Sequence, residues 1–179
     1  TAAKPPPKFS QAGIAFVVFC ALASTIYLLN DTMDRERDRL HPLKRLRPIA
    51  SGELKVQAAV GAIVVLTVLS LAGSLYLGVD FLVVALIYLG INFLYSTGLK
   101  KVVILDVMVV AMGYVLRVLA GGMAIDVVVS NWLLLSTIFM ALFLTFSKRR
   151  HELELLDERA AAQREVLGHY SPTFLDQMI

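Results

Sequence analysis

The 179-residue sequence has few of the residues that mark several common kinds of protein site. It holds one cysteine, Cys20, so a disulfide framework within the chain is excluded. It contains no zinc-ligand spacing, no nucleophile elbow and no glycine-rich phosphate loop. Charged residues are missing from four long stretches, which cover residues 12–29, 58–79, 81–99 and 127–147. The chain is therefore best understood from its uncharged segments and from the charges between them.

The uncharged stretches predict membrane-spanning helices. Each is close to the roughly 20 residues that cross about 30 Å of hydrocarbon as a helix. A fifth run, residues 102–125, is long enough but carries two charges. We therefore predict an all-α integral membrane protein, a helix bundle that forms a single transmembrane domain over residues 1–179. Its predicted parts are five spans, at about 11–29, 56–79, 81–99, 102–125 and 130–147, and a cytoplasmic amphipathic segment at 148–169.

The basic residues predict how the bundle is oriented. Fourteen of the 17 lysines and arginines lie in residues 30–55, 100–101 and 148 onward, which five alternating crossings place on one side. By the positive-inside rule that side is the cytoplasm. We expect a multi-pass protein of the cell (inner) membrane with its active site facing the cytoplasm, no nucleic-acid partner, and a native chain that continues beyond both ends. No pattern indicates an oligomeric state.

Three aspartates follow the first uncharged stretch directly. On a continuing helix, Asp31, Asp34 and Asp38 fall at i, i+3 and i+7 and share one face. Clustered carboxylates repel unless a cation neutralises them, and Mg²⁺ binds through one or two carboxylates while keeping positions for water and phosphate oxygens. We predict that the three aspartates bind Mg²⁺, hold a diphosphate and are catalytic. The alternative is a solvated helix end on which acidic and basic residues alternate.

Concentrated basic residues suit the same polyanionic substrate. The alternative is plain topology, because basic residues gather on the cytoplasmic side of membrane proteins without any substrate. A hydroxyl at Tyr95 could orient a phosphate or sugar, although tyrosine is common at a membrane interface. The basic candidates are Lys44, Arg45, Arg47, Lys100, Lys101, Lys148, Arg149 and Arg150.

Two ionisable residues lie within the fourth predicted span. Such groups are costly in hydrocarbon and usually face the bundle interior or a watery cavity. Asp106 and Arg117 are almost three turns apart, so they share a face with roughly 16 Å of rise between them. We expect Asp106 to join the polar cavity. We expect Arg117 to be a structural residue bonded to backbone carbonyls rather than a substrate contact.

With these residues in view, the chain resembles the UbiA superfamily of intramembrane prenyltransferases. Asn30, Asp31, Asp34 and Asp38 match its first signature, N-D-x-x-D-x-x-x-D, in full. The resemblance implies nine transmembrane helices around a central cavity, Mg²⁺ on two aspartate-rich motifs and a lipid tail that enters from the side. This chain corresponds to the second through sixth of those helices.

The second motif departs from the common pattern. Where aromatic prenyltransferases carry D-x-x-x-D, residues 147–152 read S-K-R-R-H-E, which is similar to the K-R-x-x-E of the decaprenyl-phosphate phosphoribosyltransferase branch. That branch also carries H-P-x-K-R-x-R-P-I-A-x-G, matched by residues 41–52. The resemblance implies Mg²⁺-dependent transfer of 5-phosphoribose from phosphoribosyl diphosphate to a polyprenyl phosphate, as in cell wall arabinan biosynthesis. The substrate-binding residues it implies are Asn30, Lys44, Arg45, Arg47, Tyr95, Lys100, Lys148, Arg149 and Glu152.

Two alternatives remain open at this point. One is a prenyl diphosphate transferase of the same fold that acts on an aromatic or other small acceptor. The other is a membrane scaffold or transporter bundle, in which the charges within the spans serve packing or conduction. The complete aspartate motif counts against the second.

Overall fold

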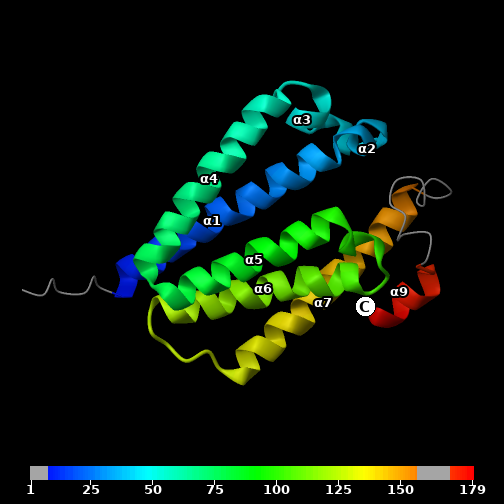
Figure 1. Ribbon diagram of the computed structural model, residues 1–179. Coiled ribbons are helices and arrows are strands. Elements are labelled where there is room, and N and C mark those ends of the chain that lie inside the picture. Colours follow the sequence, from blue (N-terminus) through cyan, green and yellow to red (C-terminus); the bar gives the residue numbers. More distant parts are fainter. Residues whose placement is uncertain (1–7, 157–169) are drawn as a thin grey trace, which may run out of the picture.

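The computed structural model describes residues 8–156 and 170–179, which are helices joined by short connections, with no strand in these two ranges (Figure 1). Most of the helical residues lie in five long helices, and short helical turns connect them at one end of the bundle. The elements are α1 Lys8–Met33, α2 Arg35–Leu40, η1 Lys44–Leu46, α3 Pro48–Ser51, α4 Val56–Leu77, α5 Val79–Thr97, η2 Leu99–Lys101, α6 Leu105–Ala124, α7 Asn131–Leu156 and α9 Pro172–Met178.

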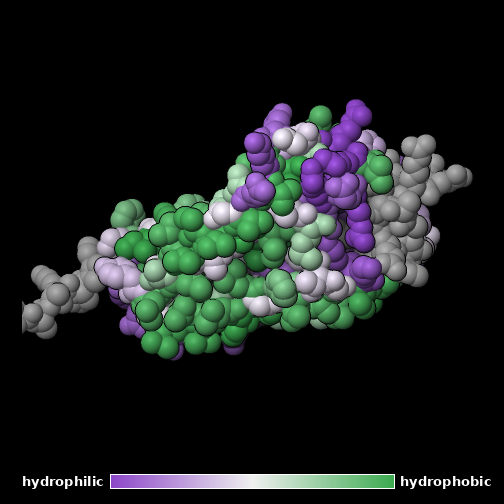
Figure 2. All heavy atoms as spheres, turned by 45° about the horizontal axis from the view of Figure 1, so that its top comes forward, coloured by the Kyte–Doolittle hydropathy of each residue, from purple (hydrophilic) through white to green (hydrophobic). Residues whose placement is uncertain are grey.

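The long helices α1, α4, α5, α6 and α7 are each apolar and long enough to cross a membrane. Many large apolar side chains on them are exposed, among them Val64, Leu69 and Phe139. In Figure 2 hydrophobic residues cover most of the visible face, and hydrophilic residues gather at one end of the molecule. The predicted all-α membrane bundle of five spans is confirmed, and the chain is a multi-pass membrane protein.

Successive spans run antiparallel because their connections are short. Gly78 alone separates α4 from α5, with φ at +133°, a conformation that side-chain-bearing residues rarely adopt. Residues 125–130 join α6 to α7 at the same end of the bundle (Figure 1). The aspartate-bearing end of α1 lies at the opposite end, together with α2 and α3.

The main core lies where α1 packs against α5 and α6. Phe19 meets the rings of Phe81 and Tyr88 edge-on, at 5.6 and 5.5 Å between centroids. On the other side of α1, a Cβ built at Gly73 of α4 would lie 2.7 Å from Val18 Cγ2. Glycine therefore permits the close approach of α4 to α1, which is how helices commonly pack where lipid removes the hydrophobic drive.

A smaller core joins α6, α7 and α9. It is built from Val107, Phe146, Tyr170 and Leu175. α9 begins at Pro172 with Ser171 as its N-cap, and the Ser171 hydroxyl accepts a hydrogen bond from the Phe174 amide at 3.1 Å. This packing holds α9 against the polar end of α7.

Two helices extend beyond the predicted spans. α1 continues to Met33, and α7 continues to Leu156, so residues 148–156 prolong the helix of the last span. Ion pairs along α7, Arg149 to Glu152 and Arg150 to Glu154, support helical structure through this charged stretch. The remainder of the predicted amphipathic segment, residues 157–169, lies outside the described residues.

Candidate active site

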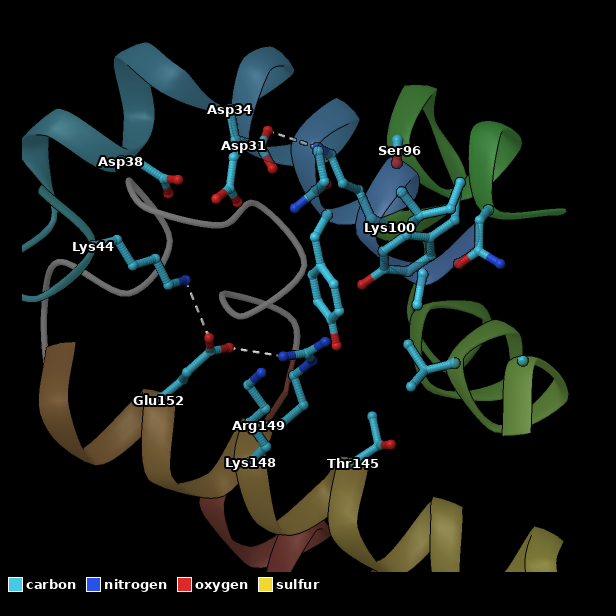
Figure 3. A pocket seen from close by; sticks show the side chains of 18 of the residues that line it. Asp31, Asp34, Asp38, Lys44, Ser96, Lys100, Thr145, Lys148, Arg149 and Glu152 are labelled. Atoms are coloured by element: carbon cyan, nitrogen blue, oxygen red, sulfur yellow. Dashed lines mark hydrogen bonds and ion pairs between the residues drawn. The ribbon is translucent and has the colours of Figure 1, made fainter. Parts of the chain in front are cut away.

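A polar pocket of about 360 Å³ lies where the ends of α1, α5 and α7 meet the short elements α2, η1 and η2 (Figure 3). Twice as many basic as acidic side chains line it, which makes it strongly cationic. The acidic members are Asp31, Asp34, Asp38 and Glu152, and the basic members are Arg37, Lys44, Arg47, Lys100, Lys101, Arg117, Lys148 and Arg149.

The helix that carries the aspartates is interrupted between them. α1 ends at Met33 and α2 begins at Arg35, with Asp34 at the junction (φ −91°, ψ 5°). The amides of Asp34 and Asp38 still donate to the carbonyls four residues earlier, both at 2.8 Å. The expectation of one uninterrupted helix is therefore wrong, yet helical bonding persists across the junction and all three carboxylates line one pocket.

Basic side chains neutralise the three aspartates. Nη1 of Arg47 bridges Asp31 Oδ1 at 2.6 Å and Asp38 Oδ2 at 2.9 Å. Nζ of Lys100 lies 2.6 Å from Asp34 Oδ1 (Figure 3). Burial nevertheless raises the pKa of the Asp38 carboxyl above its ordinary value, although Arg47 acts in the opposite direction.

The oxygen atoms beside this cluster have the chemistry of a magnesium site. Within residues 8–156 and 170–179, no three acidic, histidine or cysteine side chains already converge as ligands. The buried Oδ1 of Asn30 has no hydrogen-bond partner there, and Asn30 precedes Asp31 in the same wall of the pocket. An unpartnered buried oxygen next to two carboxylates fits a hard cation that prefers oxygen ligands.

Arg149 is held by two carboxylates on the opposite wall. Its Nε donates to Asp106 Oδ2 and its Nη1 to Glu152 Oε2, both at 2.8 Å, and its side chain is 3% exposed. Glu152 also accepts from Lys44 Nζ at 3.2 Å, which links α7 to η1 (Figure 3). Asp106 is fully buried behind Arg149 and does not line the pocket. The expectation that it joins the cavity is therefore wrong, because Arg149 stands between them.

Tyr170 completes the shell around Asp106. Its hydroxyl donates to Asp106 Oδ1 at 2.7 Å and accepts from the Ile104 amide at 2.8 Å. Burial and the bond to Asp106 raise the pKa of Tyr170 to about 12, so the hydroxyl stays protonated. The segment before α9 thereby fixes a carboxylate that in turn fixes Arg149.

The turn after α2 aims Lys44 and Arg47 at the pocket. His41 is buried, and its Nδ1 accepts from the amides of Leu43 and Lys44 at 3.1 and 3.3 Å. Burial lowers the pKa of His41, which keeps the imidazole neutral and able to accept. Residues 44 and 47 are one 3₁₀ turn apart and both line the pocket.

Nearly all the residues singled out from the sequence meet in this pocket. Arg45 does not, because it lies between Lys44 and Arg47 on the η1 turn and its side chain is exposed. Arg150 also lies outside the pocket, where it pairs with Glu154 and Asp176. The predicted residues that line the pocket are Asn30, Asp31, Asp34, Asp38, Lys44, Arg47, Tyr95, Lys100, Lys101, Lys148, Arg149 and Glu152.

The sequence reasoning missed Tyr88 and Asn92, which extend a polar stripe on α5. Tyr88, Asn92, Tyr95 and Ser96 fall at i, i+4, i+7 and i+8, and all four line the pocket. Residues at this spacing share one face of a helix, so the stripe could have been predicted from the polar residues within the otherwise apolar run. Arg117 also differs from expectation, because it donates to the Tyr88 hydroxyl at 2.8 Å and not to backbone carbonyls.

The fold and the pocket together define a class of protein, a multi-pass membrane helix bundle with an aspartate-lined cationic site at one end. The model of the UbiA prenyltransferase family matches residues 1–166, and the chain belongs to that family. The family membership predicted from the aspartate signature is thus confirmed.

Curated relatives and a solved structure extend this result. Decaprenyl-phosphate phosphoribosyltransferase from Mycolicibacterium smegmatis is 40% identical over 166 residues, which cover 93% of this chain and 52% of that protein. The enzyme of the same name from Mycobacterium tuberculosis is 42% identical, covering 93% of this chain and 55% of its own length. This chain therefore spans about half the length of the curated relatives it matches. The structure of a UbiA homolog from Archaeoglobus fulgidus bound to DMAPP and Mg²⁺ shares the fold, with a TM-score of 0.80 at 21% identity over 98% of this chain and 62% of that one.

Proposed function

We propose that the protein transfers 5-phosphoribose from phosphoribosyl diphosphate to a polyprenyl phosphate, such as decaprenyl phosphate, and releases diphosphate. The observation that carries this proposal is the basic pair Lys148 and Arg149 in the pocket wall opposite the aspartates. The two curated relatives with this reaction in their name support it at 40 and 42% identity.

The charge of the pocket suits a donor with phosphate at both ends. One end, a diphosphate, matches the aspartate wall if a metal ion bridges them. The other end, a phosphate monoester, matches Lys148 and Arg149, since charge-assisted bonds to phosphate are among the stronger hydrogen bonds. A second carboxylate pair at residues 148–152 would repel that phosphate, so the basic pair favours this donor over a prenyl diphosphate.

The residues that would hold Mg²⁺ are Asp31, Asp34 and Asp38, with Asn30 Oδ1 as a neutral ligand. When bound, the ion would supply Lewis-acid stabilisation of the charge on the departing diphosphate. Arg47 and Lys100 pair with these carboxylates in the structure. With substrate bound, the two side chains would add two positive charges beside the diphosphate.

Transfer requires one bond to break and one to form at C1 of ribose. The C1–O bond to diphosphate breaks and its electron pair leaves with the diphosphate. An oxygen of the lipid phosphate forms the new C1–O bond from the opposite face, with inversion at C1. The acceptor is already anionic, so the protein needs no strong general base. The residues of the chain bind, orient and neutralise charge.

The polar end of the bundle faces the cytoplasm in this proposal. Its basic excess over the opposite end supports that orientation through the positive-inside rule. A water-soluble, highly charged donor then reaches the pocket from the cytoplasm while the lipid remains in the membrane.

An assay of diphosphate release tests the proposal. The full-length protein is incubated with Mg²⁺, phosphoribosyl diphosphate and a polyprenyl phosphate, and with the Asp34→Asn variant as control. We expect release that needs both substrates and Mg²⁺ and that the variant loses. If the protein ignores phosphoribosyl diphosphate and consumes a prenyl diphosphate with an aromatic acceptor, the alternative transferase replaces this one.

A further inference from the structure

Arg117 has an unusual setting for a charge within a membrane span. Its Nη2 donates to the Tyr88 hydroxyl at 2.8 Å, and its guanidinium carbon lies 5.4 and 5.1 Å from the ring centroids of Tyr88 and Tyr114. In the part of the chain that the structure describes, no carboxylate pairs with it. Two tyrosines therefore orient a cation whose charge is not compensated by an acidic side chain. Such a group within a span indicates a functional site.

Arg117 stands where two cavities of opposite character meet. It lines the polar pocket, and it also lines an apolar groove of about 450 Å³ between α1 and α6. Ala23 lines both cavities as well, so the groove continues from the deep end of the pocket. The rest of the groove wall is apolar or small, and comprises Ala12, Ala15, Phe16, Phe19, Cys20, Gly121 and Ile125.

We propose that this junction binds the acceptor lipid, with the phosphate of a polyprenyl phosphate on Arg117 and its isoprenoid tail in the α1–α6 groove. The inference rests on the proposed function and extends it to a site within the same cavity. An uncompensated guanidinium at one end of an apolar channel complements a molecule with a single anionic head and a long hydrocarbon tail. Free phosphate has no hydrocarbon tail to contact the apolar channel, and a neutral lipid has no charge to pair with Arg117.

The placement also agrees with the chemistry of transfer. The aspartates and Arg117 are at opposite ends of the polar pocket, because Asp31 and Asp34 close α1 while Arg117 lies three turns into α6. A lipid phosphate at Arg117 approaches the donor from the side away from the diphosphate. Attack from that side gives the inversion at C1 that direct displacement requires.

The first experiment measures recognition of the headgroup without turnover. Binding of farnesyl phosphate and of farnesol to the full-length protein in detergent is compared for wild type, Arg117→Gln and Arg150→Gln. Arg150 is the matched control, since it pairs with Glu154 and Asp176 outside the pocket. We expect wild type and Arg150→Gln to prefer the phosphate by about ten- to a hundredfold, and Arg117→Gln to bind both ligands alike.

A purely structural role for Arg117 predicts a different outcome. The proposal is overturned if Arg117→Gln weakens the binding of farnesyl phosphate and farnesol by the same factor, or if its preference for farnesyl phosphate over farnesol is unchanged. Inorganic phosphate is the third probe, and displacement of farnesyl phosphate by it at similar concentrations would show that the site binds free phosphate and not a lipid. If Arg117→Gln does not fold, Tyr88→Phe keeps the ring and removes the oriented hydroxyl, and must still lower the preference.

The second experiment tests the tail. Gly121 lines the groove and a Cβ built there meets nothing within 4 Å, so the side chain in Gly121→Leu starts in open space and occupies part of the groove. Gly61→Leu is the matched control, because Gly61 on α4 is equally open but lies outside both cavities. Leucine favours helix more than glycine does at either site. We expect Gly121→Leu to raise the acceptor KM about tenfold or more with the donor KM unchanged, and Gly61→Leu to change neither.

Failure of this inference is distinguishable from failure of the proposed function. If Gly121→Leu leaves the acceptor KM unchanged, the groove does not hold the tail and the inference falls, whatever the donor. If the protein never uses phosphoribosyl diphosphate but prefers farnesyl phosphate to farnesol through Arg117, the lipid site stands and the donor assignment falls.

Discussion

Arg47 bridges Asp31 and Asp38 through one guanidinium nitrogen, so the aspartate wall is already neutralised by the chain's own cations. The Asp31–Arg47 pair is partly exposed, with 23% of the Asp31 side chain accessible. A pair of this kind contributes at most about 1 kcal/mol to stability, so the chemical role of Asp31 can be tested separately from folding. Asp38 is buried, with 7% of its side chain accessible, so a change at Asp38 costs more stability than a change at Asp31.

We expect Asp31→Asn and Asp34→Asn each to lower turnover by about a hundredfold or more, because a charged metal ligand is lost while shape is kept. Asp38→Asn should lower it less if Asp38 contacts the ion through water. Initial rates over a range of Mg²⁺ concentrations test this, with thermal unfolding as the control for folding. Wild-type rates at limiting Mg²⁺ in the Asp31 or Asp34 variants would remove the magnesium site from this position.

Lys148 and Arg149 differ in how cleanly they can be tested. Removal of Arg149 leaves Asp106, which is fully buried, without its cation, and breaking a buried pair in this way costs about 3–5 kcal/mol. Arg149→Ala therefore lowers stability as well as donor binding. Lys148→Ala should raise the donor KM by about one to two orders of magnitude and leave the acceptor KM nearly unchanged. An acceptor KM that moves as far as the donor KM would place Lys148 elsewhere in the reaction.

Asp106 is a positioning residue, because it orients the guanidinium of Arg149. Asp106→Asn keeps the shape and the bond from Tyr170, but removes the charge that holds Arg149 Nε. We expect a donor KM raised about tenfold with kcat less affected, since the guanidinium loses its orientation and not its charge. Equal changes in donor and acceptor KM for Asp106→Asn would indicate a general structural role.

Arg149→Lys should restore only part of the loss of donor binding seen in Arg149→Ala if the planar guanidinium binds phosphate through two hydrogen bonds.

At the scale of elements, the stability of the turn at residues 41–47 depends on pH through His41. Neutral His41 accepts two backbone N–H groups, and its pKa is lowered from 6.5 in the folded protein. The unfolded chain therefore binds the proton more readily. The stability that His41 contributes is complete above pH 6.5 and is lost as the pH falls from 6.5 through the lower folded pKa.

We expect the donor KM to rise as the pH falls through the pKa of His41 in the folded protein, which lies below 6.5, because protonation of His41 loosens the turn that carries Lys44 and Arg47. The measurement is donor KM from pH 5 to 7.5 for wild type and His41→Asn. Asparagine can accept the same bonds through Oδ1 but does not titrate, so the variant keeps only the pH dependence of the substrate phosphates. An identical profile for both proteins would exclude His41 as the cause.

Elements whose signals are local in the sequence were predicted correctly. The aspartates share a wall because their spacing is set within nine residues, and four of the five spans follow from the length of uncharged stretches. The pairs Lys100 with Asp34, Arg149 with Asp106 and Tyr170 with Asp106 join residues 43 to 66 positions apart. Such contacts depend on how the helices pack against one another, so they could not be predicted from residue spacing along the sequence. The length of α7 was missed for a related reason, since its charged end is stabilised by pairs that form only once it is helical.

For the whole molecule, the basic asymmetry predicts which end faces the cytoplasm. Ser51→Cys and Asp80→Cys, each in a Cys20→Ala background, place single thiols at exposed positions on opposite ends of the bundle. Asp80 serves better than Gly78, whose φ of +133° disfavours a side chain. We expect a membrane-impermeant thiol reagent to label the two from opposite sides of sealed vesicles. Labelling of both from the same side would show that the number of crossings between them is wrong.

The local pairing of Arg47 has a consequence for how the protein is made. The chain emerges from the ribosome N-terminus first, and Arg47 follows Asp31 by only 16 residues and Asp38 by nine. Both carboxylates thus gain a counter-charge before α5, with Lys100 behind it, has been translated. Lys44 must wait for Glu152, which arrives 108 residues later. Among the described residues, assembly of the site follows the order of translation, and α7 contributes Glu152 after Arg47 has paired with the aspartates.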